Sequence, residues 1–254
     1  KLPLVSIDPQ IANAKINHQL QLSTVYTALL TNCLEQPEER RVQRLTEQMA
    51  QIEHIVHRRS ALEMLNREPR LVLLGDPGSG KSTFINFVAL CLAGESLGYD
   101  DANLHVLTMP LSDELDKACR CDDGKESMPQ PWDHGPLLPV RIILRDLAAR
   151  GLPELGSPIS HHTLWNFIVS EMGDVLKEYA PYLRQELLER GGLILLDGLD
   201  EVPDADHRRD QVKQVVQSFV RSFPHCRFLV TSLTYAYQNQ NWKLQDFTEV
   251  TLSP

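Results

Sequence analysis

The sequence has few aromatic residues and lacks any long apolar run. Phe, Trp and Tyr together make up 6% of its 254 residues, and no apolar stretch approaches the roughly 20 residues that a membrane-spanning helix needs. No signal peptide opens the sequence. Because the first residue is Lys1 and not Met, we expect a fragment of a longer protein. We also expect no membrane partner.

Cysteine is scarce and odd in number. The five cysteines are irregularly spaced and lie mostly in apolar segments: Cys33, Cys91, Cys119, Cys121 and Cys226. A disulfide framework in a small secreted domain instead has an even number of cysteines. The pattern therefore predicts reduced thiols and a cytoplasmic protein.

Positive charge is in deficit. The chain has 25 Lys and Arg against 34 Asp and Glu, so its formal net charge is −9 at pH 7. The basic excess that marks many nucleic-acid-binding domains is absent from the composition. We therefore do not expect this fragment to bind nucleic acid. The composition is otherwise ordinary for a globular protein, with 42% hydrophobic and 23% charged residues.

The first part of the chain, residues 1–68, carries one clear helical pattern. From Glu38 to Asn66, apolar residues recur three or four positions apart, which predicts a long amphipathic helix that ends before Pro69. Upstream of it, Val25–Leu30 is either a strand or a short packed segment. We expect this N-terminal segment to precede a separate domain at 69–254.

From Leu71 onward, short apolar runs alternate with amphipathic helical patterns. The runs lack polar alternation, so the predicted strands are buried on both faces, as in a parallel sheet covered by helices. The predicted strands are Leu71–Leu74, Val140–Leu144, Leu193–Leu196, Arg227–Thr231 and Val250–Leu252. The predicted helices are Ser82–Ala93, Leu164–Tyr179, Pro181–Glu189 and His207–Ser222. The fold class is therefore α/β, a parallel five-stranded sheet flanked by helices, with 112–136 as an inserted surface loop.

The first strand runs into a turn that matches G-x-x-x-x-G-K-[ST], the Walker A pattern, at every fixed position. Glycines let the chain turn tightly, so that backbone N–H groups point at phosphate oxygens, and the next helix adds its positive dipole end. Lys81 supplies a cation for the β- and γ-phosphates, Ser82 a hydroxyl for Mg²⁺, and Thr83 a contact near the α-phosphate. The predicted nucleotide-binding residues are Gly75, Asp76, Pro77, Gly78, Ser79, Gly80, Lys81, Ser82 and Thr83.

The strand Leu193–Leu196 delivers a carboxylate, Asp197, to its carboxyl end. In phosphate-loop enzymes this Walker B carboxylate holds Mg²⁺ beside the hydroxyl of the loop. Asp197 and Ser82 are therefore the predicted metal-binding residues. Asp200 and Glu201 follow, and either could orient and deprotonate the attacking water. The alternative for these two is a solvated acidic turn. No guanine-reading N/T-K-x-D segment occurs in the sequence, which favours ATP over GTP.

Together, Leu71–Phe84 and Leu193–Val202 resemble the NACHT branch of the STAND signalling nucleotidases. In that family the acidic strand has four apolar residues followed by D-G-x-D-E, and Asp197–Glu201 match this pattern. Leu138–Leu147 also resembles the second strand of the family and the turn after it. The resemblance covers about residues 20–254.

The resemblance implies an AAA-like phosphate-loop fold and a regulatory ATPase module. Such a module holds ADP in a closed state and exchanges it for ATP when a fused sensor domain meets its trigger. It then self-associates and activates a fused effector, in phage defence, regulated cell death or innate immunity. The sensor and effector would lie outside this chain. The resemblance also implies slow ATP hydrolysis, with Lys81, Asp200 and Glu201 as the catalytic residues.

One position departs from the family pattern. The sensor strand of the family usually ends T-S-R, with the Arg near the γ-phosphate, whereas this chain has Leu233 after Thr231 and Ser232. Losing such a group commonly costs on the order of 10²–10³ in rate, so we expect impaired hydrolysis or impaired γ-phosphate sensing. Two alternatives to the switch stay open: a continuously cycling ATPase motor or remodeller, and a catalytically weak nucleotide-binding scaffold.

Overall fold

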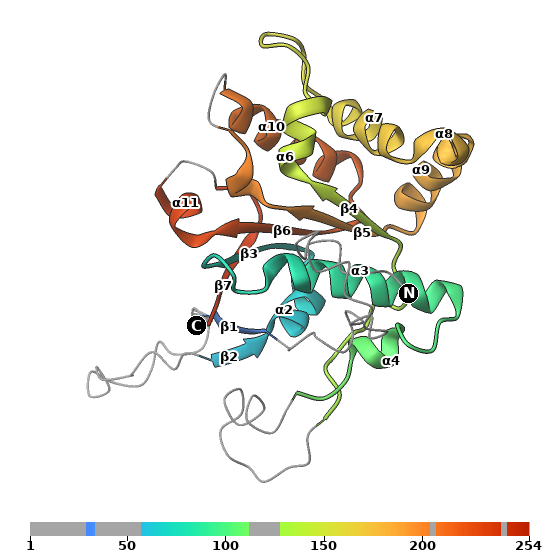
Figure 1. The fold of residues 1–254 in the computed structure, drawn as a ribbon, viewed down its shortest axis with the longest axis vertical. Helices are drawn as coiled ribbons and strands as arrows, with labels where there is room; N and C mark the ends of the chain where they lie inside the picture. The colour runs from blue at the N-terminus through green and yellow to red at the C-terminus, as the bar shows by residue number, and fades with distance from the viewer. Residues whose placement is uncertain (1–28, 34–56, 112–127, 204–206, 240–242, 254) are drawn as a thin grey trace, which may run out of the picture.

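The computed structural model describes residues 29–33, 57–111, 128–203, 207–239 and 243–253. At its centre is a seven-stranded mixed sheet with the strand order β2-β1-β7-β3-β6-β5-β4 (Figure 1). The strands are β1 (Leu30–Cys33), β2 (His57–Ser60), β3 (Arg70–Gly75), β4 (Pro139–Ile143), β5 (Leu193–Asp197), β6 (Arg227–Leu233) and β7 (Thr248–Leu252).

Five neighbouring strands, β7, β3, β6, β5 and β4, run parallel to one another. They are the strands that the apolar runs predict, so the parallel α/β core is confirmed. The prediction of five strands was nevertheless two short, because β1 pairs antiparallel with both β2 and β7. The two additional strands have only four residues each and are largely polar, Leu-Thr-Asn-Cys and His-Arg-Arg-Ser, so neither produces an apolar run.

The strand β2 also corrects the predicted helix Glu38–Asn66. Residues 38–56 lie outside the described part of the chain. Among the described residues of this segment, His57–Ser60 form the extended strand β2, and the helix α2 (Ala61–Arg67) begins after it. The helix begins where it does because the Ser60 hydroxyl accepts a hydrogen bond from the Glu63 N–H at 3.0 Å. The apolar periodicity therefore runs across a strand and a helix, and the cap sets the boundary between them.

The elements before residue 69 contribute to the same core as those after it. The strand β1 extends the sheet, and four residues of α2 pack with β3 and the first turns after the phosphate loop: Ala61, Leu62, Met64 and Leu65. Of the predicted segment Val25–Leu30, residues 25–28 lie outside the described part, and Leu30 is the first residue of β1. The domain boundary at residue 68 stays a prediction.

Helices of very different length connect the strands. They are α3 (Lys81–Leu97), α4 (Leu104–Leu107), α6 (Leu144–Asp146), η2 (Leu147–Gly151), α7 (His161–Glu171), α8 (Gly173–Leu176), η3 (Lys177–Tyr179), α9 (Ala180–Glu189), η4 (Leu199–Glu201), α10 (Arg208–Ser222) and α11 (Thr234–Asn239). Three of them, α3, α9 and α10, match predicted helices within a few residues. The single predicted helix Leu164–Tyr179 is wrong, because Gly173, with a φ of 69°, breaks it into α7, α8 and η3.

The two faces of the sheet carry separate apolar clusters. Leu71 and Leu73 of β3 pack with α2 and α3, whereas Val72 and Leu74 pack with α7 and α10. Figure 1 shows the same division, with α2 and α3 on one side of the sheet and α7 and α10 on the other. None of the helices in the described ranges combines the length and the apolar character that crossing a membrane requires.

Because the central strands are parallel, their carboxyl ends meet at one edge of the sheet. There β3 ends at Gly75, β5 at Asp197 and β6 at Leu233, and β6 lies between the other two. This edge is the place where the two sequence motifs come together. Within the predicted insertion, residues 112–127 lie outside the described part, and the chain from 128 to 136 forms neither helix nor strand.

Candidate functional site

The glycine-rich turn between β3 and α3 forms a tight loop whose shape depends on glycine. Gly78 and Gly80 have φ angles of 78° and 89°, a left-handed conformation that side chains disfavour. A Cβ on Gly75 would lie 2.7 Å from the Ser79 Oγ and 3.3 Å from the Leu252 Cβ, so a side chain at this position would displace its neighbours. The phosphate-loop prediction thus matches a strand, a glycine-dependent turn and a helix start in the expected order.

Lys81 folds back over this loop. Its Nζ donates hydrogen bonds to the carbonyl oxygens of Gly75 at 2.8 Å and Asp76 at 2.9 Å, and to the Ser79 Oγ at 3.2 Å. Burial lowers the pKa of Lys81, while nearby carboxylates, that of Asp200 foremost, oppose this shift. The ammonium group therefore lies at the centre of the loop, among neutral acceptors that phosphate oxygens would outcompete.

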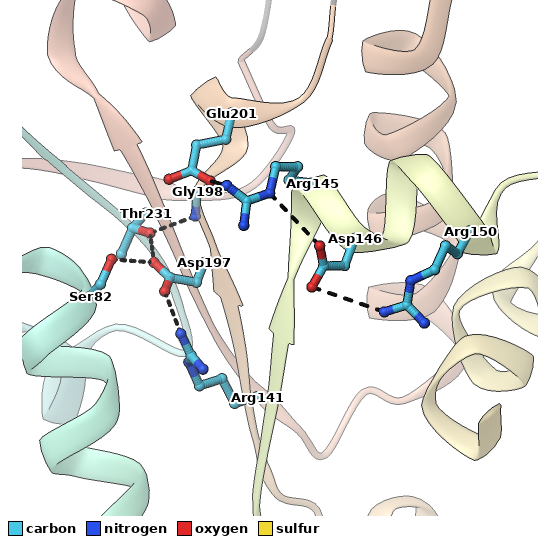
Figure 2. Close-up of polar contacts among 9 residues, drawn as sticks. All are labelled: Ser82, Arg141, Arg145, Asp146, Arg150, Asp197, Gly198, Glu201 and Thr231. Carbon is cyan, nitrogen blue, oxygen red and sulfur yellow. Dashed lines mark hydrogen bonds and ion pairs between the residues drawn. The ribbon is translucent and has the colours of Figure 1, made fainter. Parts of the chain in front are cut away.

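Asp197, at the end of β5, is the most heavily bonded acceptor of the site (Figure 2). Its Oδ1 accepts a hydrogen bond from the Ser82 Oγ at 3.0 Å and one from the Thr231 Oγ1 at 2.8 Å. Its Oδ2 accepts one from the Arg141 Nη2 at 3.0 Å. Only 6% of the residue is exposed, so the sheet and the loop hold this carboxylate in one place.

Thr231 and Arg141 are site residues that the sequence did not identify as such. The Thr231 hydroxyl bridges the site, because it donates to Asp197 and accepts the Gly198 N–H at 2.9 Å. It thereby fixes the turn after β5, where Gly198 has a φ of 77°. Arg141 reaches Asp197 from the neighbouring strand β4.

Asp200 is fastened to the end of the sensor strand. Its Oδ1 accepts a hydrogen bond from the backbone N–H of Leu233 at 2.9 Å. The position at which the family places an arginine is therefore directly linked to the acidic turn η4, through its backbone. One oxygen of Asp200 thus has a backbone partner in the sheet, whereas the carboxylate of Glu201 is paired with an exposed side chain.

Glu201 lies on a more open surface. Its Oε2 is 3.1 Å from the Arg145 Nη1, and the two side chains are 48% and 59% exposed. Arg145 also approaches Asp146, and Asp146 approaches Arg150, at 3.7 and 4.0 Å (Figure 2). The carboxylate thus belongs to a chain of exposed ion pairs that runs along α6 and η2, and such pairs contribute little to stability.

The oxygen atoms at this edge of the sheet are suitable ligands for Mg²⁺. The Ser82 hydroxyl and the Asp197 carboxylate are oxygen ligands held 3.0 Å apart, and Mg²⁺ prefers such oxygens together with water and phosphate. Within the described ranges, three or more His, Cys, Asp or Glu side chains nowhere gather into a metal cluster. A cation here would therefore depend on phosphate oxygens and water for most of its ligands.

The structure brings together the predicted residues of the loop and of the acidic strand, although Ser82 and Asp197 are 115 residues apart in the sequence. The NACHT domain profile matches residues 69–254. A comparison with curated proteins found no match. The profile spans the phosphate loop, the acidic strand and the sensor strand, which are the elements that form the site described above. The chain therefore belongs to the NACHT domain family of P-loop NTPases.

Proposed function

We propose that the chain binds ATP and ADP with Mg²⁺ and hydrolyses ATP slowly, as the switch module of a signalling protein. The observation that carries the proposal is the hydrogen bond of 3.0 Å between the side chains of Ser82 and Asp197. It lies beside the phosphate loop, and the ammonium group of Lys81 lies at the centre of that loop. This contact unites the two groups that a phosphate-loop NTPase uses to hold a metal-bound triphosphate.

Each part of the site has a separate task in this proposal. The loop from Gly75 to Gly80 and the first turn of α3 bind phosphate through backbone N–H groups. Lys81 exchanges its carbonyl partners for β- and γ-phosphate oxygens. Mg²⁺, held by Ser82 and Asp197, would neutralise phosphate charge. Glu201 orients the attacking water and accepts its proton, because its carboxylate is the less constrained of the two.

The switch would use the link between η4 and the end of β6. Asp200 bonds the backbone of Leu233, so a change of the acidic turn on hydrolysis would be passed to the sensor strand. Leu233 offers no charge to the γ-phosphate, which supports slow turnover. A catalytically weak scaffold is the second candidate. Two features favour it: the carboxylate of Glu201 is paired with Arg145, and Leu233 carries no charge.

At the level of the whole protein, we propose that ATP binding promotes self-association through this domain. A fused sensor would supply the trigger and a fused effector the output, in defence or cell-death signalling. The support for this role is the membership in the NACHT family and the D-G-x-D-E sequence of Asp197–Glu201.

Calorimetric titration with ATP, ADP and GTP in Mg²⁺ tests the proposal. We expect ADP to bind at least as tightly as ATP, GTP more weakly, and Lys81→Ala to reduce affinity for all three by at least about 100-fold, since a charge-assisted phosphate contact is lost. Lys177→Ala is the matched control, because it removes an exposed lysine whose partner is Asp174. Equal binding by wild type and Lys81→Ala would refute the assigned site, and weak ADP with strong ATP would favour a cycling motor.

A further inference from the structure

Arg141 is an unusual residue for its position. It lies in the middle of β4, whose other residues, Pro139, Val140, Ile142 and Ile143, are all apolar. In the register of the sheet, Arg141 is paired with Leu195 and Ile143 with Asp197. Alternate residues of a strand share a face, so Arg141 lies on the same face as Asp197, two residue pairs further from the carboxyl end. A charged side chain among apolar residues therefore calls for a structural or functional explanation.

The side chain runs along the sheet toward the candidate metal site (Figure 2). Its Nη2 donates to the Asp197 Oδ2 at 3.0 Å, and 34% of the side chain is exposed against 8% for that of Asp197. Because β4 is the last strand of the sheet, the guanidinium lies near the open edge, while the carboxylate is buried. The arginine can therefore leave this contact for solvent, whereas the aspartate cannot.

The contact changes what the carboxylate can do for a metal ion. An ionised carboxylate has about four lone-pair directions, and hydrogen bonds from Ser82, Thr231 and Arg141 use three of them. The guanidinium also carries a permanent positive charge, because arginine stays protonated in proteins. Asp197 and Arg141 together are thus electrically neutral, and a cation beside Ser82 gains less from them than from the carboxylate alone.

The guanidinium of Arg141 and a Mg²⁺ ion beside Ser82 would be close to each other. Hydrogen bonds of 3.0 Å on either side of one carboxylate separate the guanidinium from the Ser82 hydroxyl. That separation is within about one Debye length at physiological salt, so ions in solution screen the repulsion only in part.

We propose that Arg141 is a built-in counter-cation of Asp197 that sets the Mg²⁺ affinity of this site. It lowers that affinity by competing with the metal for the same carboxylate, so that Mg²⁺ binds tightly only when it arrives with a nucleotide, or when Arg141 has turned away. This inference deepens the proposed nucleotide function and rests on it only for the identity of the site. Its consequence is a site that stays free of Mg²⁺ in the absence of nucleotide phosphates.

The test is the dependence of the melting temperature on MgCl₂, at constant ionic strength, for the wild type and Arg141→Gln, without nucleotide and with ADP. Glutamine keeps an N–H donor for Asp197 and removes the charge. We expect the Mg²⁺ concentration at half of the thermal shift to fall at least about tenfold in Arg141→Gln, because a positive charge near the metal has been removed. Arg141→Lys, which keeps the charge, should stay within about threefold of the wild type.

Arg150→Gln is the matched control, since it removes an arginine of the following segment whose partners are Glu171 and Asp146. It should leave the Mg²⁺ dependence unchanged. A lower melting temperature of Arg141→Gln with an unchanged Mg²⁺ midpoint would overturn the proposal and make the ion pair a structural brace. The proposal would also be overturned if Arg141→Gln weakened ADP binding in EDTA, since Arg141 would then be a phosphate contact.

Failure of the proposed function is separable from these outcomes. A wild type that shows no ADP-dependent thermal shift, with or without Mg²⁺, would refute nucleotide binding. The Mg²⁺ titrations without nucleotide would still decide the role of Arg141: a tenfold gain on Arg141→Gln would support it, and equal curves, or no Mg²⁺ response in either protein, would contradict it.

Discussion

Asp197 and Glu201 lie four residues apart but have opposite surroundings. Asp197 is 6% exposed and accepts hydrogen bonds from three side chains that belong to α3, β6 and β4. The side chain of Glu201 is 48% exposed, and its carboxylate pairs with Arg145, whose side chain is 59% exposed. One carboxylate is part of the core, and the other lies on the surface.

The difference separates binding from turnover. A group that holds Mg²⁺ benefits from a fixed position, since a rigid site needs no reorganisation when the ligand arrives. A group that orients water must exchange partners during each cycle, and a weak surface ion pair permits that. Under the proposed function, the site would therefore bind through its buried carboxylate and hydrolyse through its exposed one. Substitutions at the two positions should therefore differ in kind.

The largest effect on stability is expected for Asp197→Ala. The substitution leaves Arg141 and the hydroxyls of Ser82 and Thr231 without their acceptor. Hydrogen bonds to a charged group contribute about 1.5–3 kcal/mol each, so the loss of this acceptor should cost about 3 kcal/mol or more. Urea denaturation in EDTA measures the free energy of unfolding without any contribution from a metal.

Asp174→Ala is the control for this prediction, because it also removes a carboxylate that pairs with a cation. The side chain of Asp174 is 96% exposed, so we expect no measurable change in the free energy of unfolding. Equal losses for the two variants would mean that burial of Asp197 does not determine its contribution, and the comparison above would be wrong.

A smaller loss is expected for Thr231→Val, which keeps the shape of the side chain and removes the hydroxyl. That hydroxyl donates to Asp197 and accepts the N–H of Gly198. Leaving a buried backbone donor unsatisfied costs about 1–3 kcal/mol, so the free energy of unfolding should fall by about 2 kcal/mol in the same urea experiment. Thr163→Val, a half-buried threonine of α7, should change it by less than about 1 kcal/mol.

The sequence predicted the parts of this site that are contiguous in the chain. The phosphate loop and the D-G-x-D-E turn are local patterns, and short, largely apolar runs predicted the parallel sheet. The strand β2 and the break at Gly173 could not be predicted in this way, because pairing with β1 and a single left-handed residue decided them. The spacing of apolar residues indicates neither the pairing of strands nor the conformation of a single glycine.

Arg141 and Thr231 were missed for a different reason. Each is a polar residue within a largely apolar predicted strand, and each bonds a residue that is far away in the sequence. The signal was present, because parallel strands bring their carboxyl ends to one edge and polar residues near those ends meet there. What the sequence lacked was the strand order, which places β4 and β6 on either side of β5.

The smallest effect on stability and the sharpest effect on turnover are expected for Glu201→Gln. Its ion pair with Arg145 is exposed, so the free energy of unfolding should change by less than about 0.5 kcal/mol. The affinities for ATP and ADP should stay the same, because no part of the phosphate loop is altered. Phosphate release in a single turnover should slow by about 100-fold or more, since a neutral amide cannot accept the proton of the attacking water.

Glu171→Gln is the matched control, because Glu171 pairs with Arg150 in a similarly exposed position outside the site. If both variants released phosphate at the wild-type rate, Glu201 would be a solvated acidic residue and the base would have to be sought at Asp200. A wild type that binds ATP but releases no phosphate would instead identify a scaffold. In that case Asp197 would have retained its role and Glu201 would have lost its role, as expected if the buried carboxylate serves binding and the exposed one serves only turnover.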